Sequence, residues 1–214
     1  MSTKPILFNT EMVRAILDGR KNCTRRIVKP QPQGRLCYTF AGGDCGTWGY
    51  PSKTAYENWG DEYKLPEDIT DEELKRRWNP PYHTDDILYV RETWRKGLER
   101  YIYRADYSDT EKFYQDGKEI NMKWHPSIHM PKEVARIWLK VTDVRVERLQ
   151  DISGESLTKE GIDLFQSNYV RVAFDEFKNI WNSTIKKSDL DRYGWNANPW
   201  VWVIEFERCE REVE

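Results

Sequence analysis

The sequence predicts an α+β fold: a small mixed β-barrel with a few flanking helices. Six or so segments have the composition and spacing of strands, whereas only a few have the periodicity or capping residues of helices. Ten Trp and twelve Tyr residues suit a β-rich core, although aromatic side chains also stack on nucleic-acid bases. A chain of 214 residues is most simply one domain, 1–214, and is long enough to bury a substantial core.

The composition indicates a cytoplasmic protein. Charged residues make up 33% of the chain and its formal net charge is −2. No apolar run approaches the roughly 20 residues of a membrane span, and the N-terminus lacks the apolar core of a signal peptide. Without such an apolar run we expect no membrane partner. The four cysteines include no Cys-x-x-Cys pair, so we expect free thiols.

The N-terminal residues predict an edge strand and then a helix. Pro5 places residues 3–8 at a sheet edge, because proline cannot donate a hydrogen bond to a central strand pair. Asn9 or Thr10 then caps a helix, which Gly19 ends. The apolar residues at helical spacing are Met12, Val13, Ile16 and Leu17.

A second strand, residues 25–28, is stopped by Pro30, and a long irregular insertion follows at about 33–82. Glycine and proline interrupt its periodicity, and a capping box that begins at Thr70 predicts a short helix through Trp78. Loops of this length are usually functional or disordered. We interpret the insertion as a lid, a surface decoration or a surface that binds a protein partner.

The middle of the chain predicts further strands. Residues 87–94 and 101–104 are typical of a β-hairpin, and residues around Asp116 of a smaller one. The longest strand pattern covers residues 134–148, and a change of phase near Asp143 indicates a β-bulge.

Two helices and a final strand complete the prediction. Ser153 caps a short helix that ends at Glu160, and residues 169–182 form an amphipathic helix before a last strand at 200–207. Residues 191–200, which precede that strand, are rich in aromatic and amide side chains. They form either one wall of a base-binding cleft or a packed loop that holds the strand.

A local excess of positive charge predicts a site for anions. Between residues 14 and 35 one residue, Asp18, is acidic, and seven are basic: Arg14, Arg20, Lys21, Arg25, Arg26, Lys29 and Arg35. In a chain of net charge −2, such a cluster favours a phosphate-bearing ligand, either RNA or a nucleoside or nucleotide.

Lys21 and Thr24 lie three residues apart within this cluster. An amine beside a hydroxyl can act as a base and a nucleophile, as in Ser–Lys and Thr–amine enzymes. Lys21 must first lose its own proton, which burial and the neighbouring cations Arg20, Arg25 and Arg26 favour. The alternative is a solvated phosphate-binding loop without catalysis.

Other candidate residues carry weaker signals. Glu160 closes a short helix, where the helix dipole disfavours a carboxylate unless a cation such as Lys21 faces it. Cations flank Cys23 and can make its thiol reactive. His125 and His129 are four apart, but the proline between them opposes a regular helix and no acid completes a metal site. We expect neither a metal nor a cofactor.

Several motifs together resemble a known family. The segment GRKNCTRR at 19–26 is similar to the Gly-x-Lys-x-x-(Glu/Thr)-x-Arg signature of activating-signal-cointegrator homology (ASCH) domains, which are related to the PUA RNA-binding barrel. Further segments resemble a phage and prophage branch of ASCH proteins: TRRIVKP at 24–30, VRETW at 90–94, WHPSIHMP at 124–131, VTDVRVERLQDIS at 141–153 and ANPWVW at 197–202. The resemblance covers most of the chain outside residues 33–80. A phage origin implies the host cytoplasm as location.

The resemblance implies a PUA-like barrel with a basic cleft that binds RNA or a nucleotide. One bacterial branch, the N4-acetylcytidine amidohydrolases, removes an acetyl group from a modified cytidine with a Lys, a Thr and a Glu. The Lys and Thr correspond to Lys21 and Thr24 here. The Glu corresponds to Glu160, with Glu155 as a rival. The resemblance then leads us to expect that four residues of the signature bind the ligand: Gly19, Arg20, Arg25 and Arg26.

Three functional hypotheses follow from these residues. In the first, the protein hydrolyses an acyl amide on a cytidine-like base through Lys21, Thr24 and Glu160. In the second, it is a non-catalytic RNA-binding module. In the third, it is an accessory phage protein that acts through protein contacts of the insertion. The sequence predicts no oligomeric state.

Overall fold

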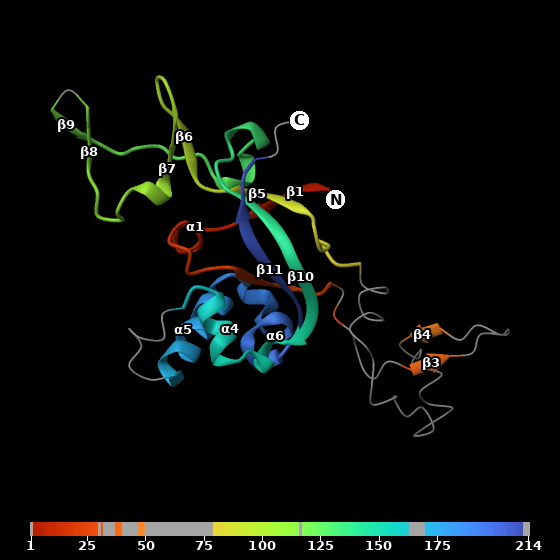
Figure 1. Cartoon of the computed structure of the whole chain (residues 1–214). Helices are drawn as coiled ribbons and strands as arrows, with labels where there is room; N and C mark the ends of the chain where they lie inside the picture. Colours follow the sequence, from red (N-terminus) through yellow and green to blue (C-terminus); the bar gives the residue numbers. More distant parts are fainter. Residues whose placement is uncertain are drawn as a thin grey trace.

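The computed structural model describes residues 2–29, 31, 37–39, 47–49, 79–115, 117–162 and 170–211. Its centre is a mixed five-stranded sheet (Figure 1). In spatial order the strands are β1 (Thr3–Leu7), β5 (Ile87–Arg91), β10 (Trp138–Arg148), β11 (Trp200–Cys209) and β2 (Cys23–Ile27). Strand β1 runs parallel to β5, and every other neighbouring pair is antiparallel. The predicted α+β class is therefore confirmed.

The expected closure into a barrel is not seen in the described part of the chain. The sheet is open, with β1 at one edge and β2 at the other. The two edge strands nevertheless come close, because Nη2 of Arg26 in β2 donates a hydrogen bond of 2.9 Å to the carbonyl of Leu7 in β1. A side chain thus spans the gap that strand pairing would close in a barrel.

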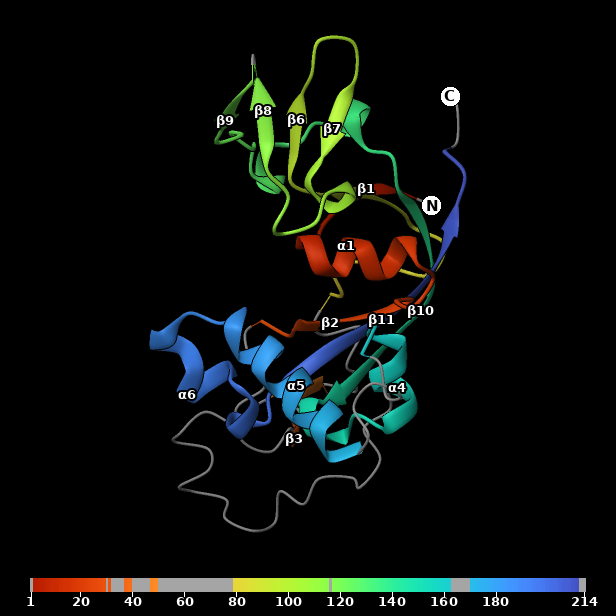
Figure 2. The same cartoon turned by 90° about the vertical axis from the view of Figure 1, so that its left-hand side faces the viewer.

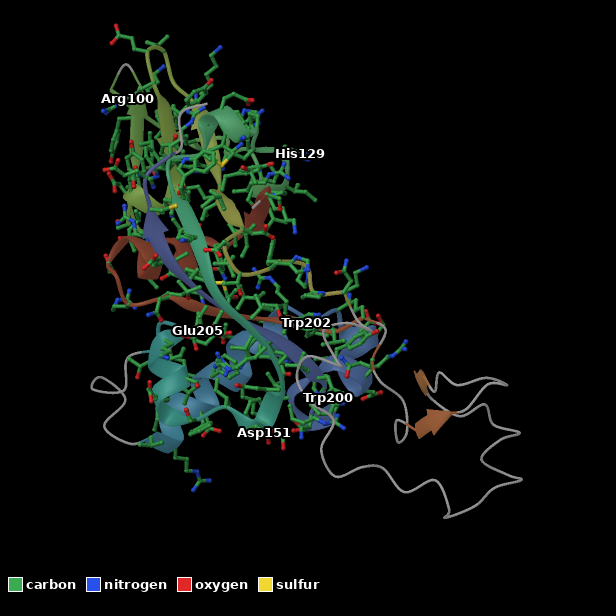
Figure 3. The ribbon with its side chains drawn as sticks, turned by 45° about the vertical axis from the view of Figure 1, so that its right-hand side comes forward. Arg100, His129, Asp151, Trp200, Trp202 and Glu205 are labelled. Carbon is green, nitrogen blue, oxygen red and sulfur yellow. The ribbon has the colours of Figure 1, made fainter. Side chains whose placement is uncertain are left out.

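The long strands β10 and β11 run side by side through the centre of the sheet (Figure 1). Their register shifts between Val141 and Asp143, so the bulge predicted near Asp143 is confirmed. In Figure 3, Asp151 and Trp200 lie at the end of the sheet where the helices gather, and Arg100 lies at the opposite end.

Helix α1 (Thr10–Leu17) covers one face of the sheet. Asn9 accepts a hydrogen bond from the Met12 N–H and caps the helix, as one of the two predicted alternatives. Gly19 adopts the left-handed φ of 74° that ends the helix and turns the chain toward β2. The buried core under α1 includes Ile6, Phe8, Val13, Ile16, Leu139, Val141, Ile204 and Phe206.

A second core lies on the side of β2 opposite α1, where the other α-helices gather (Figure 2). These helices are α4 (Gly154–Lys159), α5 (Val170–Ser183) and α6 (Leu190–Tyr193). Ser153 caps α4 through its hydroxyl, as predicted. Within this core, Ala173, Phe177 and Trp181 of α5 pack against Cys23, Leu149, Ile152, Leu157, Val201 and Val203.

Short hairpins and 3-10 turns complete the described structure. The hairpins are β3 (Cys37–Thr39) with β4 (Thr47–Gly49), β6 (Trp94–Lys96) with β7 (Tyr101–Tyr103), and β8 (Phe113–Gln115) with β9 (Lys118–Ile120). The 3-10 helices are Arg104–Asp106, Ser127–His129, Lys132–Val134, Leu149–Asp151, Lys187–Asp189 and Trp195–Ala197. No helix among the described residues is long and apolar enough to cross a bilayer.

Two predictions for the middle of the chain need correction. The predicted hairpin of residues 87–94 with 101–104 is two units, because β5 joins the main sheet and β6 alone pairs with β7. The insertion at 33–82, predicted to be irregular apart from one short helix, contains the β3–β4 pair. The helix predicted from Thr70 to Trp78 and the proposed protein-binding role of the insertion fall outside the described residues.

The segment before β11 holds the start of that strand, which was one of its two predicted roles, but it is partly helical (α6 and the 3-10 helix Trp195–Ala197) and not a loop throughout. Asn198 takes a left-handed φ of 45°, and its side-chain oxygen accepts a 2.8 Å hydrogen bond from the Gln150 N–H. Its carbonyl accepts a second bond, of 3.0 Å, from Arg148 Nη1. These bonds fasten the start of β11 to the end of β10.

Candidate functional site

The two residues at the centre of the site come from opposite parts of the chain. Lys21 follows the turn after α1, and Glu160 caps the C-terminal end of α4. An isolated antiparallel bridge joins their backbones, and Lys21 Nζ lies 2.5 Å from Glu160 Oε2 and 3.0 Å from the Glu160 carbonyl oxygen. The side chains are 1% and 6% exposed. The cation expected to offset the helix dipole at Glu160 is therefore present.

Gly161 makes this approach possible. Its φ of 95° belongs to the left-handed region that favours glycine. A Cβ at this position would lie 3.2 Å from the Lys21 Cβ and 3.0 Å from the Ala15 Cβ. A side chain here would therefore push the Glu160 turn away from Lys21.

Arg25 is the second cation on Glu160. Its Nη1 lies 3.0 Å from Glu160 Oε1, and its Nη2 lies 3.2 Å from Glu147 Oε2 on β10. The Arg25 side chain is 1% exposed, so its ion pair with the buried Glu160 is shielded from water, whereas Glu147 is 25% exposed. Glu147 in turn binds Arg145 at 2.6 Å, so that a chain of alternating charges extends from Lys21 onto the sheet.

Glu155, the rival of Glu160, lies elsewhere. Its side chain is 82% exposed, and it pairs with Lys159 at 3.5 Å one helical turn away. Among the two candidate carboxylates, Glu160 is therefore the one that faces Lys21.

Thr24 and Arg26 lie on the Phe8 side of β2. Arg26 Nη1 donates a 3.1 Å hydrogen bond to Thr24 Oγ1. The Phe8 ring centre is 5.4 Å from Arg26 Cζ and 5.9 Å from Lys21 Nζ, so both cations contact the same aromatic ring. Desolvation by burial lowers the pKa of the Arg26 guanidinium.

A pocket of about 560 Å³ runs along β2, between α1 and α5. This volume is in the range of small-molecule sites. Its polar lining includes Arg20, Thr24, Arg25, Arg26, Lys29 and Glu160, and its apolar lining includes Met12, Ala15, Ile27, Phe177, Ile180 and Trp181. Lys21 does not line the pocket directly but contacts Glu160, which does.

The remaining candidates have distinct places. Arg20 is 46% exposed at the pocket, where it bonds the Gly161 carbonyl and Asp18. Gly19 serves the turn after α1 rather than the pocket lining. Cys23 is fully buried, and burial together with the nearby Glu160 raises the pKa of its thiol to about 12. Burial thus opposes the reactivity that the flanking cations can confer on this thiol.

Sequence reasoning missed the apolar wall that α5 gives to the pocket. The helical spacing of Phe177 and Trp181 correctly predicted a buried face, because each is less than a tenth exposed. The same spacing does not show that part of this face borders a cavity. Glu147 was also missed, because its partner Arg25 is 122 residues away in the sequence.

Comparison with solved structures gives a match to the ASCH domain from Lactobacillus crispatus JV V101. The match covers 97% of this chain and 79% of that one, with 11% sequence identity and a TM-score of 0.35. No protein-family model and no curated protein matches the sequence. A likeness at this level carries no argument about activity, which has to come from the residues of the site.

Proposed function

We propose that the protein is an ASCH-like amidohydrolase, which binds a cytidine-like nucleoside beside β2 and hydrolyses an acyl amide on its base. The observation that carries the proposal is the 2.5 Å contact between Lys21 and Glu160, at the wall of a pocket that Thr24 also lines. The resemblance to N4-acetylcytidine amidohydrolases names the same three residue types. The contact between Lys21 and Glu160 is an observation independent of that resemblance.

Each of the three residues has a chemical role in this proposal. Glu160 takes a proton from the Lys21 ammonium along their short hydrogen bond, which leaves a neutral amine. Lys21 accepts the hydroxyl proton as Thr24 Oγ1 attacks the acyl carbon. The C–N bond then breaks, the base leaves with a proton from Lys21, and water hydrolyses the acyl-threonine ester to release the acid.

The cations of the site support this chemistry. Arg26 already donates to Thr24 Oγ1, and a donor at this oxygen stabilises negative charge during proton removal. Arg25 holds the second oxygen of Glu160 and so fixes the carboxylate toward Lys21. Arg20 is more exposed at the pocket and suits a phosphate of a nucleotide or RNA.

Binding without catalysis is the second candidate, and the burial of the charges favours it. Lys21 and Arg25 are each 1% exposed and already paired with Glu160, as expected of a fixed structural network. In that case the pocket binds RNA in a salt-dependent manner, and Thr24→Ala has little effect.

Variants of Thr24 separate the two candidates. We expect N4-acetylcytidine to be converted into cytidine and acetate, and Thr24→Ala to reduce kcat by more than about 100-fold while substrate binding persists. Thr24→Ser, which keeps a hydroxyl, should retain part of the rate. Equal turnover by the wild type and Thr24→Ala would show that Thr24 is not the nucleophile. RNA binding without any turnover would favour the second candidate.

A further inference from the structure

Strand β2 lies at the edge of the sheet, and its residues Thr24, Arg25, Arg26 and Ile27 line the pocket. On one side β2 pairs with β11. Two hydrogen bonds, one at each end, show which residues of β2 bond to β11. The Val28 N–H donates to the Trp200 carbonyl at 3.1 Å, and the Phe206 N–H donates to the Asn22 carbonyl at 2.9 Å. Antiparallel pairing alternates between residues that bond the partner strand and residues that do not.

This alternation determines which backbone groups face away from the sheet. Thr24 and Arg26 are in phase with Val28, so their N–H and C=O groups bond to β11. The corresponding groups of Arg25 and Ile27 point outward. Of the described residues, none accepts a hydrogen bond from either N–H.

The end of α4 contacts the start of β2. The Asn22 N–H bonds to the Lys159 carbonyl at 3.0 Å, next to the Lys21–Glu160 bridge. The Lys159–Glu160 segment therefore lies against the start of β2, whereas Arg25 and Ile27, whose backbone groups face outward, are both among the residues that line the pocket. This short free length suits a small ring better than an extended peptide, which needs a longer continuous edge.

The side chains around the free edge suit a flat, partly polar ligand. Met12 and Ala15 of α1 lie on one side of the pocket, and Phe177 and Trp181 of α5 lie on the other. Apolar and aromatic walls accommodate the faces of a ring, while a strand edge offers hydrogen bonds to its rim. In addition, the buried Nε–H of Arg25 has no partner within the described structure. Unpaired buried donors are costly, so this end of the pocket favours an acceptor-bearing ligand.

We propose that the base of the bound nucleoside is read by the backbone of β2, with its Watson–Crick edge toward the strand and its faces between α1 and α5. The ring nitrogen N3 of a cytosine accepts a hydrogen bond from the Arg25 N–H, beside Thr24. This inference rests on the proposed function, since it assumes that a nucleoside occupies the pocket. It adds that strand β2 recognises the base, and that the Watson–Crick edge of the base is the part recognised.

Cytidine analogues test which edge is recognised. 3-Deazacytidine replaces N3 by a C–H group and removes the acceptor, whereas 5-methylcytidine leaves the Watson–Crick edge intact. Loss of one hydrogen bond to a buried donor corresponds to roughly a ten-fold weaker affinity or more. By titration calorimetry on the full chain, we expect 5-methylcytidine to bind like cytidine and 3-deazacytidine to bind at least about ten-fold more weakly.

Amide NMR spectra locate the contact on the protein. Cytidine should shift the Arg25 amide proton downfield and slow its exchange with solvent, and 3-deazacytidine should do neither. The amide protons of Thr24 and Arg26 serve as matched controls, because both already bond to β11.

The possible outcomes separate the two proposals. If cytidine and 3-deazacytidine bind equally and the Arg25 amide is unaffected, the backbone contact is refuted while nucleoside binding stands. If no nucleoside binds, both proposals fail. If an extended peptide shifts the Arg25 amide and nucleosides do not, the edge is a peptide site and the inference is overturned.

Discussion

Replacing Glu160 by glutamine removes the negative charge from a carboxylate that two buried cations share. The side chain keeps its size, and one oxygen can still accept a hydrogen bond. Lys21 and Arg25, each 1% exposed, then remain in the interior with less compensation for their charge. Arg25 retains its 3.2 Å contact with Glu147, so Lys21 bears most of the loss.

The magnitude follows from the burial of this network. Removing one partner of a buried ion pair costs about 3–5 kcal/mol, because the remaining charge stays desolvated. The retained Glu147 contact places the expected loss near the lower end, about 3 kcal/mol. This is a large share of the roughly 5–15 kcal/mol that stabilises a typical domain. With a urea dependence of about 1–3 kcal/mol per molar, the unfolding midpoint should fall by about 1 M or more.

Glu155→Gln is the matched control for this measurement. The substitution is chemically the same and affects the same helix, but Glu155 is 82% exposed. Its effect should stay within about 0.5 kcal/mol. Urea unfolding followed by tryptophan fluorescence measures both variants. Equal stability of the wild type and Glu160→Gln would refute the view that Glu160 balances two buried cations.

Further predictions concern pH, thiol reactivity and backbone conformation. Burial raises the pKa of Asp86, but hydrogen bonds from the Lys4 ammonium and other donors outweigh this effect and lower it overall. The stability that ionised Asp86 contributes is present above the pKa of about 3.9 that an aspartate has in the unfolded chain, and it is lost as the pH falls through the acid range. Asp86→Asn should therefore lower the free energy of unfolding by about 1–3 kcal/mol at pH 7 and by less at pH 3. Peptide mass spectrometry after iodoacetamide treatment should find Cys23 unmodified in the native protein and modified in urea, since its thiol is fully buried and its pKa is raised to about 12; rapid native labelling would contradict this. Gly161→Ala should lower stability by about 1–2 kcal/mol because of the positive φ, whereas Gly154→Ala, where a Cβ meets nothing within 4 Å, should be neutral or stabilising; equal urea midpoints would argue against strain at the Glu160 turn.

Local features of the fold could be predicted from the sequence because each depends on neighbouring residues. The Asn9 cap, the glycine turn at Gly19, the bulge near Asp143 and the Ser153 cap are confirmed. Each involves backbone hydrogen bonds or dihedral angles within a few positions. Strand pairing was harder to predict, because β1 lies parallel to β5 although α1, β2 and the whole insertion separate them in the sequence.

The candidate site was predictable in its residue types but not in its arrangement. The charge pattern identified Lys21, Thr24 and the neighbouring arginines as a cluster. It did not show that Lys21 lies behind Glu160, a contact that spans 139 residues of sequence. Burial also separates residues that look equivalent in the sequence, since Arg25 is 1% exposed and Arg20 46% exposed. Such differences arise from tertiary packing and leave no local signal.

The release of acetate from N4-acetylcytidine, compared between the two glutamate variants, tests the central claim most directly. If Lys21, Thr24 and Glu160 form one catalytic unit, the wild type and Glu155→Gln release cytidine and acetate at similar rates. Folded Glu160→Gln should then be slower by about 100-fold or more, because its proton relay is broken. Equal rates for Glu160→Gln and Glu155→Gln, or binding of N4-acetylcytidine by the wild type without release of acetate, would contradict the claim.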